Sequence, residues 1–165
     1  MTTNDPIFEH ERLECPPEIE YTTEQLLPVV VGAHPRAELS DRPWAGKLVR
    51  DMRRILREGG QQIGEGLIPL VVSDVWFLND EALMRQPVTA LGDPGVNAAS
   101  AYFATRLPAA YAVENACQVL LDPELFELKV CLWGVNDEST GAAVEYFRQK
   151  WLQKYLDAVE LSVDV

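Results

Sequence analysis

The chain has 165 residues, the length of one ordinary domain that can bury a substantial core. Apolar residues make up 47% and charged residues 24%, a composition that excludes the profile of a disordered protein. The net charge of −12 at pH 7 opposes nonspecific binding to nucleic acid and to anionic membranes, so we expect neither as a partner. The basic run Arg50, Arg53, Arg54 and Arg57 has helical spacing, which favours a solvated helix face.

The sequence predicts a cytoplasmic protein. Its beginning lacks the basic and apolar regions of a secretory signal. No apolar run approaches the roughly 20 residues that a membrane-spanning helix needs. The three cysteines, Cys15, Cys117 and Cys131, have no CxxC spacing, so we expect free thiols in a reducing compartment.

Residues 1–24 form a polar arm, interrupted by Pro16 and Pro17, and residues 25–165 form a single domain. The domain opens with a strand over Leu26–Ala33, whose near-continuous apolar run is typical of burial on both faces. A helix follows over Pro43–Glu58, with Asp41 as its N-cap and Gly59 as its stop. A second strand covers Leu67–Ser73.

This strand could continue to Phe77, but we favour an exit from the sheet at Asp74, after which Asp80 caps a short helix over 81–85. A third strand over 87–91 precedes a helix over 98–107, which Asn97 caps. Two strands over 117–121 and 125–133 are joined by a turn too short for a parallel crossover, so they should pair antiparallel at an edge. The last helix covers about 141–159 and starts at Ser139 or Thr140.

This alternation predicts an α/β fold, a Rossmann-like three-layer sandwich with a mostly parallel sheet of about five strands and one antiparallel edge strand. Ligands bind such sheets beyond the carboxyl ends of the strands. The segments that follow those ends supply the candidate ligand-binding residues: Gly32, His34, Arg36, Glu38, Asp41, Arg42, Ser73, Asp74, Trp76, Gly92, Asp93, Gly95 and Asn97.

The cluster from Gly32 to Arg42 carries the most chemistry. His34 is a candidate acid or base, and Arg36 or Arg42 can hold a carboxylate or a phosphate. Glu38 and Asp41 can bind ribose hydroxyls. The alternative is that these groups pair with one another and cap the helix, with His34 bonded to backbone.

The other candidates also have two interpretations. The segment Gly92–Asn97 allows backbone amides to approach an anion, but it matches no established phosphate motif and favours a tight turn with an Asn cap. Asp74 is the best single carboxylate for acid–base work, or it caps the next turn. Trp76 and Phe77 can stack on a flat ring, although core packing is the commoner role of such a pair.

No motif identifies a cofactor or a nucleophile. There is no GxSxG elbow, and Cys131 should be a small buried apolar residue. With His10 and His34 as the chain's histidines, zinc has little support. A magnesium site made of Asp74, Asp93 and Asp137 is a minor alternative, since Mg²⁺ prefers oxygen ligands.

We therefore expect a protein that binds a small molecule, a nucleotide or another phosphorylated metabolite. Hydrolysis or glycosyl or phosphoryl transfer would use His34 or Asp74 as the acid–base group, but no motif decides whether the protein is an enzyme. The alternative is a non-enzymatic protein-interaction module with an acidic surface, in which tryptophans and the last helix could form a homodimer face. An acidic mimic of nucleic acid has little support, because the carboxylates are dispersed along the sequence.

Overall fold

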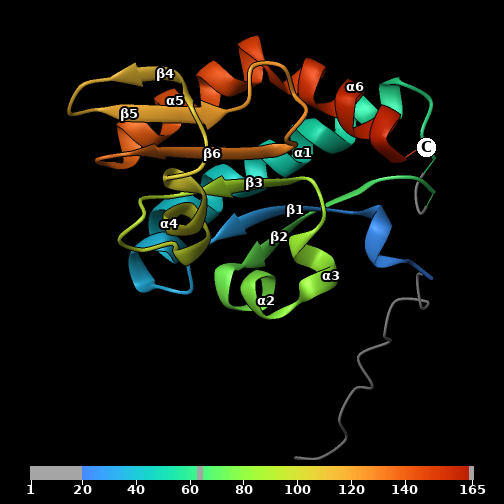
Figure 1. Ribbon diagram of the computed structural model, residues 1–165, viewed down its shortest axis with the longest axis horizontal. Helices are drawn as coiled ribbons and strands as arrows, with labels where there is room; N and C mark the ends of the chain where they lie inside the picture. The colour runs from blue at the N-terminus through green and yellow to red at the C-terminus, as the bar shows by residue number, and fades with distance from the viewer. Residues whose placement is uncertain (1–19, 63–64, 164–165) are drawn as a thin grey trace, which may run out of the picture.

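A computed structural model describes residues 20–62 and 65–163 (Figure 1). The predicted arm over residues 1–24 lies mostly outside these residues, as does Cys15. The elements in chain order are η2 (Thr23–Gln25), β1 (Leu26–Val31), η3 (Ala37–Asp41), α1 (Arg42–Glu58), β2 (Ile68–Ser73), α2 (Asp74–Asn79), α3 (Glu81–Met84), β3 (Val88–Leu91), α4 (Ala98–Ala104), β4 (Ala109–Val113), β5 (Cys117–Leu121), β6 (Lys129–Gly134), α5 (Asp137–Lys150) and α6 (Leu152–Val163).

The strands form one six-stranded sheet in the order β2-β1-β3-β6-β5-β4. The first four strands of this order pair parallel, and β5 and β4 pair antiparallel. The mostly parallel α/β class is therefore confirmed. The antiparallel edge of the sheet is confirmed as well, but the sheet has six strands rather than about five, because β4 adds a second antiparallel strand beyond β5. Its short AAYAV sequence is half exposed and lacks the apolar run that marks the central strands.

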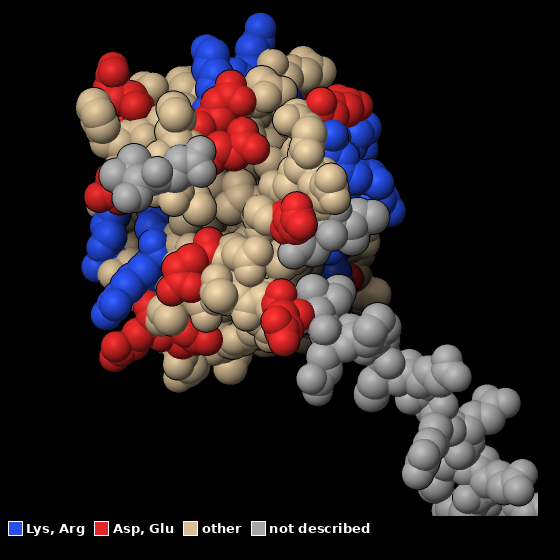
Figure 2. Space-filling view, turned by 90° about the vertical axis from the view of Figure 1, so that its right-hand side faces the viewer, with Lys and Arg blue, Asp and Glu red and all other residues tan. Residues whose placement is uncertain are grey.

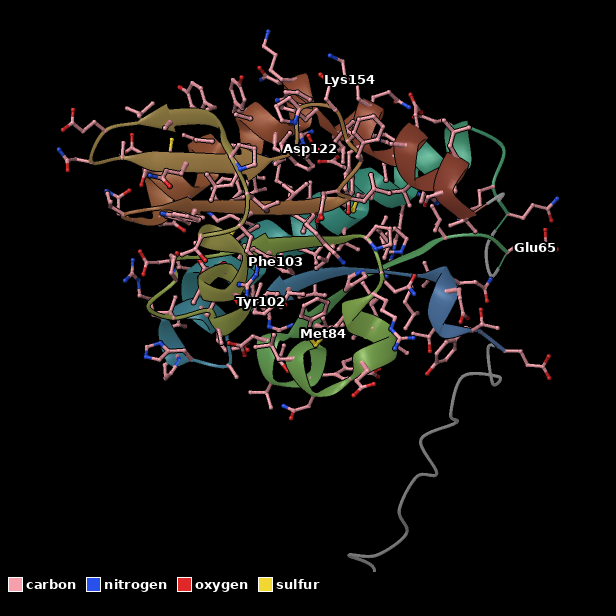
Figure 3. The ribbon with its side chains drawn as sticks, viewed as in Figure 1. Glu65, Met84, Tyr102, Phe103, Asp122 and Lys154 are labelled. Carbon is pink, nitrogen blue, oxygen red and sulfur yellow. The ribbon has the colours of Figure 1, made fainter. Side chains whose placement is uncertain are left out.

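The antiparallel pairing predicted for the fourth and fifth strands is confirmed between β5 and β6. The second of these strands starts at Lys129 rather than Leu125, because Asp122 organises the intervening turn. Its carboxylate accepts hydrogen bonds from the backbone amides of Glu124, Phe126 and Glu127. These bonds lower the pKa of Asp122, and Figure 3 shows the residue at this turn.

Helices cover both faces of the sheet (Figure 1). Helices α1, α5 and α6 pack on one face, where Leu48, Met52 and Phe147 are fully buried. Helices α2, α3 and α4 pack on the other, where Phe77 and Phe103 meet at a ring-centroid distance of 6.1 Å. Phe103 is buried, whereas its neighbour Tyr102 on α4 is 41% exposed (Figure 3).

The central strand β1 is buried at all six positions, as its apolar run predicts. Its side chains alternate between the two cores, with Leu27, Val29 and Val31 in one and Leu26 and Val30 in the other. Each face of β1 therefore needs a helical layer to exclude water.

The predicted last helix is two helices, α5 and α6, which meet at Trp151 with a φ of −127° and a ψ of −29°. It also starts earlier than predicted, because Asn136 is the N-cap. The Asn136 side chain accepts from the amide of Ser139 at 2.8 Å, and the Ser139 hydroxyl accepts from the amide of Asn136 at 3.0 Å.

The predicted exit of the chain from the sheet at Asp74 is confirmed, as are the caps that Asp80 and Asn97 provide. The helix after Asn97 ends at Ala104, three residues before the predicted Leu107. Cys117 and Cys131 are buried free thiols, and burial raises the pKa of Cys131 to about 12. None of the helices in residues 20–62 and 65–163 combines the length and the apolarity that crossing a bilayer requires.

Candidate functional site

Four strands of the sheet, β2, β1, β3 and β6, run parallel, so the loops after them lie at one edge of the sheet. The loops after β1 and β3 touch directly. A Cβ atom on Gly32 would lie 1.8 Å from the carbonyl oxygen of Val96, so only glycine permits this approach. We call this edge, with the loops after these four strands and the η3 turn, the carboxyl edge.

Asp74 ties three segments of the carboxyl edge together. Its Oδ1 accepts from the amide of Ala33 at 2.9 Å, and its Oδ2 accepts from the amide of Ala98 at 2.8 Å. Ser73 caps α2 by accepting from the amide of Trp76 at 3.2 Å. Because both Asp74 oxygens are engaged with backbone, Asp74 positions the loops.

The segment Gly92–Asn97 is a tight turn with an Asn cap. Asp93 accepts from the amide of Gly95 at 2.7 Å, and Asn97 accepts from the amides of Ala99 and Ser100. With Ala98 held by Asp74, the first amides of α4 already have acceptors, which argues against an anion there. The Asn97 amide group also donates to two strand carbonyls, at 3.0 and 2.9 Å.

The cluster between His34 and Arg42 lies on a helical segment that begins at Pro35, eight positions earlier than predicted. The turn η3 within it is π-helical, and the amide of Arg42 donates to the carbonyl of Ala37. Asp41 has helical φ and ψ angles of −79° and −38° and makes no capping hydrogen bond. The prediction of Asp41 as an N-cap is therefore wrong, and the π turn directs its side chain inward.

Two members of the cluster pair with each other. Arg42 donates to both carboxylate oxygens of Glu38, at 2.7 and 3.1 Å, as the alternative interpretation of this cluster predicted. His34 is exposed, and its Nδ1 accepts from the amide of Arg36 at 3.1 Å. The exposed Arg36 guanidinium donates from Nη2 to the carbonyl of Val135 at 3.2 Å, and its other N–H groups have no acceptor among residues 20–62 and 65–163.

Asp41 is the most unusual group of the carboxyl edge. It is 5% exposed, and a Cβ atom on Gly92 would lie 2.5 Å from its Oδ2. Gly92 also has a φ of +120°, so both the backbone conformation and the lack of space for a Cβ atom require glycine at this position. Within the described part of the chain, no side chain or amide makes a hydrogen bond to the Asp41 carboxylate.

The pKa of Asp41 is raised from 3.8 to about 6, first because burial penalises the charged form. The charge of Arg36 lowers this pKa, and the charges of Asp137 and Asp93 raise it. The carboxyl edge therefore holds an acid that changes charge close to neutral pH, beside one available guanidinium group.

Ser40 and Trp44 extend the site through Asp137 in a way that the sequence reasoning missed. The Oδ1 of Asp137 accepts from the Ser40 hydroxyl at 3.0 Å and from the Trp44 indole Nε1 at 3.1 Å. Trp44 in turn covers Gly141, where a Cβ atom would lie 2.4 Å from its ring. The indole nitrogen of Trp44 gave no sequence signal of its contact with Asp137.

Trp76 and Phe77 separate in the structure. Phe77 is fully buried, as expected for such a pair, whereas Trp76 is 45% exposed. Other apolar side chains at the carboxyl ends of the strands are also exposed: Val75 at 59%, Val135 at 54% and Leu39 at 84%. The carboxyl edge thus combines ionisable groups with exposed apolar ones, which is typical of a binding surface.

Among residues 20–62 and 65–163, no three His, Cys, Asp or Glu side chains form a group that could hold a metal ion. The minor magnesium alternative built on Asp74, Asp93 and Asp137 is therefore not supported, because Asp74 is engaged with backbone amides.

Comparison with known proteins adds no family to these observations. No protein-family model, curated protein sequence or solved structure matches the chain.

Proposed function

We propose that this protein is a Rossmann-like, three-layer α/β protein that binds a small hydroxylated metabolite carrying a phosphate or similar anionic group at its carboxyl edge. The observation that carries the proposal is Asp41, a buried carboxylate with a pKa of about 6 and no hydrogen bond from the described residues. The carboxylate oxygens have no donor among the described residues, and a largely buried carboxyl group of this kind is suited to receive donors from a ligand.

In this proposal, ligand hydroxyl groups donate to Asp41, as ribose or sugar hydroxyls do to carboxylates. The anionic group contacts Arg36, whose guanidinium uses one nitrogen on Val135 and keeps the others free. The first amides of α4 have acceptors within the protein, so Arg36 is the better anion contact. The exposed Trp76 ring is available to stack on a flat base or sugar face.

Any reaction at this site would use Asp41 rather than Asp74 as the acid–base group. Both Asp74 oxygens accept backbone amides, whereas a pKa of about 6 lets Asp41 exchange a proton near neutral pH. Hydrolysis and glycosyl or phosphoryl transfer are the reaction classes that such a group can serve.

The test is a thermal-shift and calorimetric screen with adenosine, AMP, ADP-ribose, NAD and ribose 5-phosphate. A ligand at about 1,000 times its dissociation constant adds roughly 4 kcal/mol, a Tm rise on the order of 10 °C at this size. We expect Asp41→Asn to weaken every hit, and Arg36→Gln to weaken phosphate-bearing hits more than adenosine. Arg85→Gln removes an exposed arginine elsewhere and serves as the control. Hits that Asp41→Asn and Arg36→Gln leave unchanged would refute the proposal.

A second candidate function, a protein-interaction module, has one observation in its favour. The exposed Leu39, Val75, Trp76 and Val135 side chains place apolar area around the same edge, where a second copy of the chain could cover it. Leu39→Ser should then shift a concentration-dependent dimer toward monomer in sedimentation velocity. Phe126→Ser is the matched control, because Phe126 is 87% exposed in the β5–β6 turn. A wild-type protein that stays monomeric at 100 μM or above would rule out the homodimer.

A further inference from the structure

A groove of about 680 Å³ lies between α1 and the start of β2, at the amino ends of the strands and away from the carboxyl edge. We call it the arginine groove, and its lining is Arg50, Asp51, Arg53, Arg54, Arg57, Gln61, Gln62, Leu67, Ile68 and Pro69. Figure 2 looks onto the side of the molecule where the amino ends of the strands lie, with Lys and Arg side chains near the margins of the view and Asp and Glu side chains between them. The volume is in the range of small-molecule sites.

The four arginines occupy positions i, i+3, i+4 and i+7 of α1, so they share one face of the helix. Asp51, the carboxylate in the lining, pairs with Arg148 at 2.5 Å and with Arg54 at 3.7 Å. Arg54 also contacts Glu58 at 3.3 Å. In the described part of the chain, Arg50, Arg53 and Arg57 form no ion pair, so the groove keeps a concentrated positive charge on a protein of net charge −12.

Two of these guanidinium groups are held in place by backbone carbonyls. Arg53 donates from Nε and Nη2 to the carbonyl of Pro69, at 3.1 and 2.8 Å. Arg57 donates from Nε to the carbonyl of Arg53 at 3.3 Å. Each guanidinium has five N–H donors, so several remain for a ligand. Groups that are already oriented lose less entropy when a ligand binds.

The wall and floor of the groove are also fixed. Gln61 pairs with both backbone groups of Leu67, accepting from its amide at 3.0 Å and donating to its carbonyl. Leu67 and Pro69 are buried and Ile68 is half-buried, so the floor is apolar. An organic body can therefore lie on the floor while anionic groups reach the arginines.

An extended polypeptide is a poor candidate for pairing with the edge of the sheet beside the arginine groove. β2 is the edge strand on this side of the sheet, but Pro69 has no amide hydrogen and its carbonyl accepts hydrogen bonds from Arg53. A peptide strand could not form a regular ladder at this position. Recognition must then use the arginine side chains, which suit the planar, bidentate contacts that phosphate groups make.

We propose that the arginine groove binds a small organic polyanion carrying at least two phosphate groups, at a site separate from the carboxyl edge. Three arginines without carboxylate partners favour a multiply charged ligand over a single carboxylate. This inference is independent of the proposed function, because its residues share nothing with Arg36 or Asp41.

The experiment is isothermal titration calorimetry with inorganic tripolyphosphate and ADP as probes, in 150 mM NaCl. The test variant is Arg50→Gln with Arg57→Gln, which keeps the structural Arg53. The matched control is Arg85→Gln with Lys154→Gln, which removes the same charge from exposed sites elsewhere (Lys154, Figure 3). We expect the test variant to raise the Kd of both probes by about tenfold or more, and the control to change it less than twofold.

Three results would overturn the proposal. One is equal weakening in the test and control variants, which would show that general charge alone attracts the probes. Another is the lack of binding of either probe to the wild type below 1 mM. The third is tighter binding of a poly-glutamate peptide than of tripolyphosphate, because the groove would then serve an acidic protein partner. Loss of binding in Asp41→Asn would instead place the polyphosphate at the carboxyl edge, which also contradicts the proposal.

Discussion

Replacement of Asp41 by Asn should stabilise the protein, and the gain should depend on pH. Asn keeps the shape of Asp41 but has no charge to desolvate. The carboxylate is 5% exposed, lies against Gly92 and has no hydrogen bond from the described residues. The pKa of Asp41 is therefore raised from 3.8 to about 6 in the folded protein, which means that folding opposes its ionisation.

The direction of this pH dependence follows from proton binding. The folded state holds the Asp41 proton more tightly than the unfolded state, so stability falls as pH rises through the window from 3.8 to about 6. Above that window the loss is constant, at most about 3 kcal/mol for a pKa difference of this size. At a chain length of 165 residues, this corresponds to a Tm difference of roughly 6–12 °C between Asp41→Asn and the wild type.

The assay is urea unfolding of the wild type and of Asp41→Asn at pH 4, 5, 6 and 7.5. The difference in unfolding free energy between the two proteins should be near zero at pH 4 and reach its full value by pH 7.5. Other titrating groups cancel in this difference. Glu114→Gln, at an exposed position, should show no such trend. A difference that is flat with pH, or that grows toward low pH, would refute the reasoning.

Three further perturbations test the packing around the site. Gly92→Ala should destabilise the fold by about 2 kcal/mol or more in urea unfolding, because Gly92 has a φ of +120° and an added Cβ atom would meet the Asp41 carboxylate. Gly46→Ala in α1 is the control, and it should not destabilise the fold because there is open space around Gly46. Asn97→Ala should cost about 3 kcal/mol in the same assay, since it removes a cap and the amide donor to two strand carbonyls. Burial lowers the pKa of Lys129 from 10.5 to about 8, so the wild type should gain stability relative to Lys129→Met as pH rises from 8 to 10.5. Urea midpoints of the two proteins that stay parallel over this pH range would contradict the prediction.

The elements with strong local signals were predictable. The apolar run of β1, the caps at Asp80 and Asn97, and the exit from the sheet at Asp74 depend on hydrophobicity and hydrogen-bond chemistry within a few residues. Such signals need no knowledge of tertiary contacts. The mostly parallel sheet followed from them, because buried strands joined by helices have few other arrangements.

The errors arose where tertiary contacts override local preference. Asp41 lies two residues before Pro43 and resembles an N-cap, but the helix starts earlier and the π turn buries the carboxylate against Gly92. β4 has a weak strand pattern and is held by its ladder to β5. The last helix is interrupted at Trp151, where the sequence has neither a glycine nor a proline to indicate a break.

For the candidate site, the sequence predicted which segments meet but not which groups stay available. Asp74 was a favoured acid–base candidate, yet both of its oxygens accept amides from loops far away in the chain. The basic run of α1 was interpreted as a solvated helix face, and nothing local indicated that β2 would close one side of it. Both outcomes depend on contacts between residues far apart in the chain, which no short stretch of the sequence indicates.

The order of the strands has a consequence for how the chain is made. β5 finds both of its partners within a short hairpin on either side, but β1 pairs only with β2 and β3, which follow it across a long helix and a further crossover. During synthesis, the all-apolar β1 therefore emerges first and waits longest for its partners. Until β2 has left the ribosome, the all-apolar β1 has no ladder to join, and its other edge stays unpaired until β3 follows, so this interval is when the nascent chain is most exposed to aggregation.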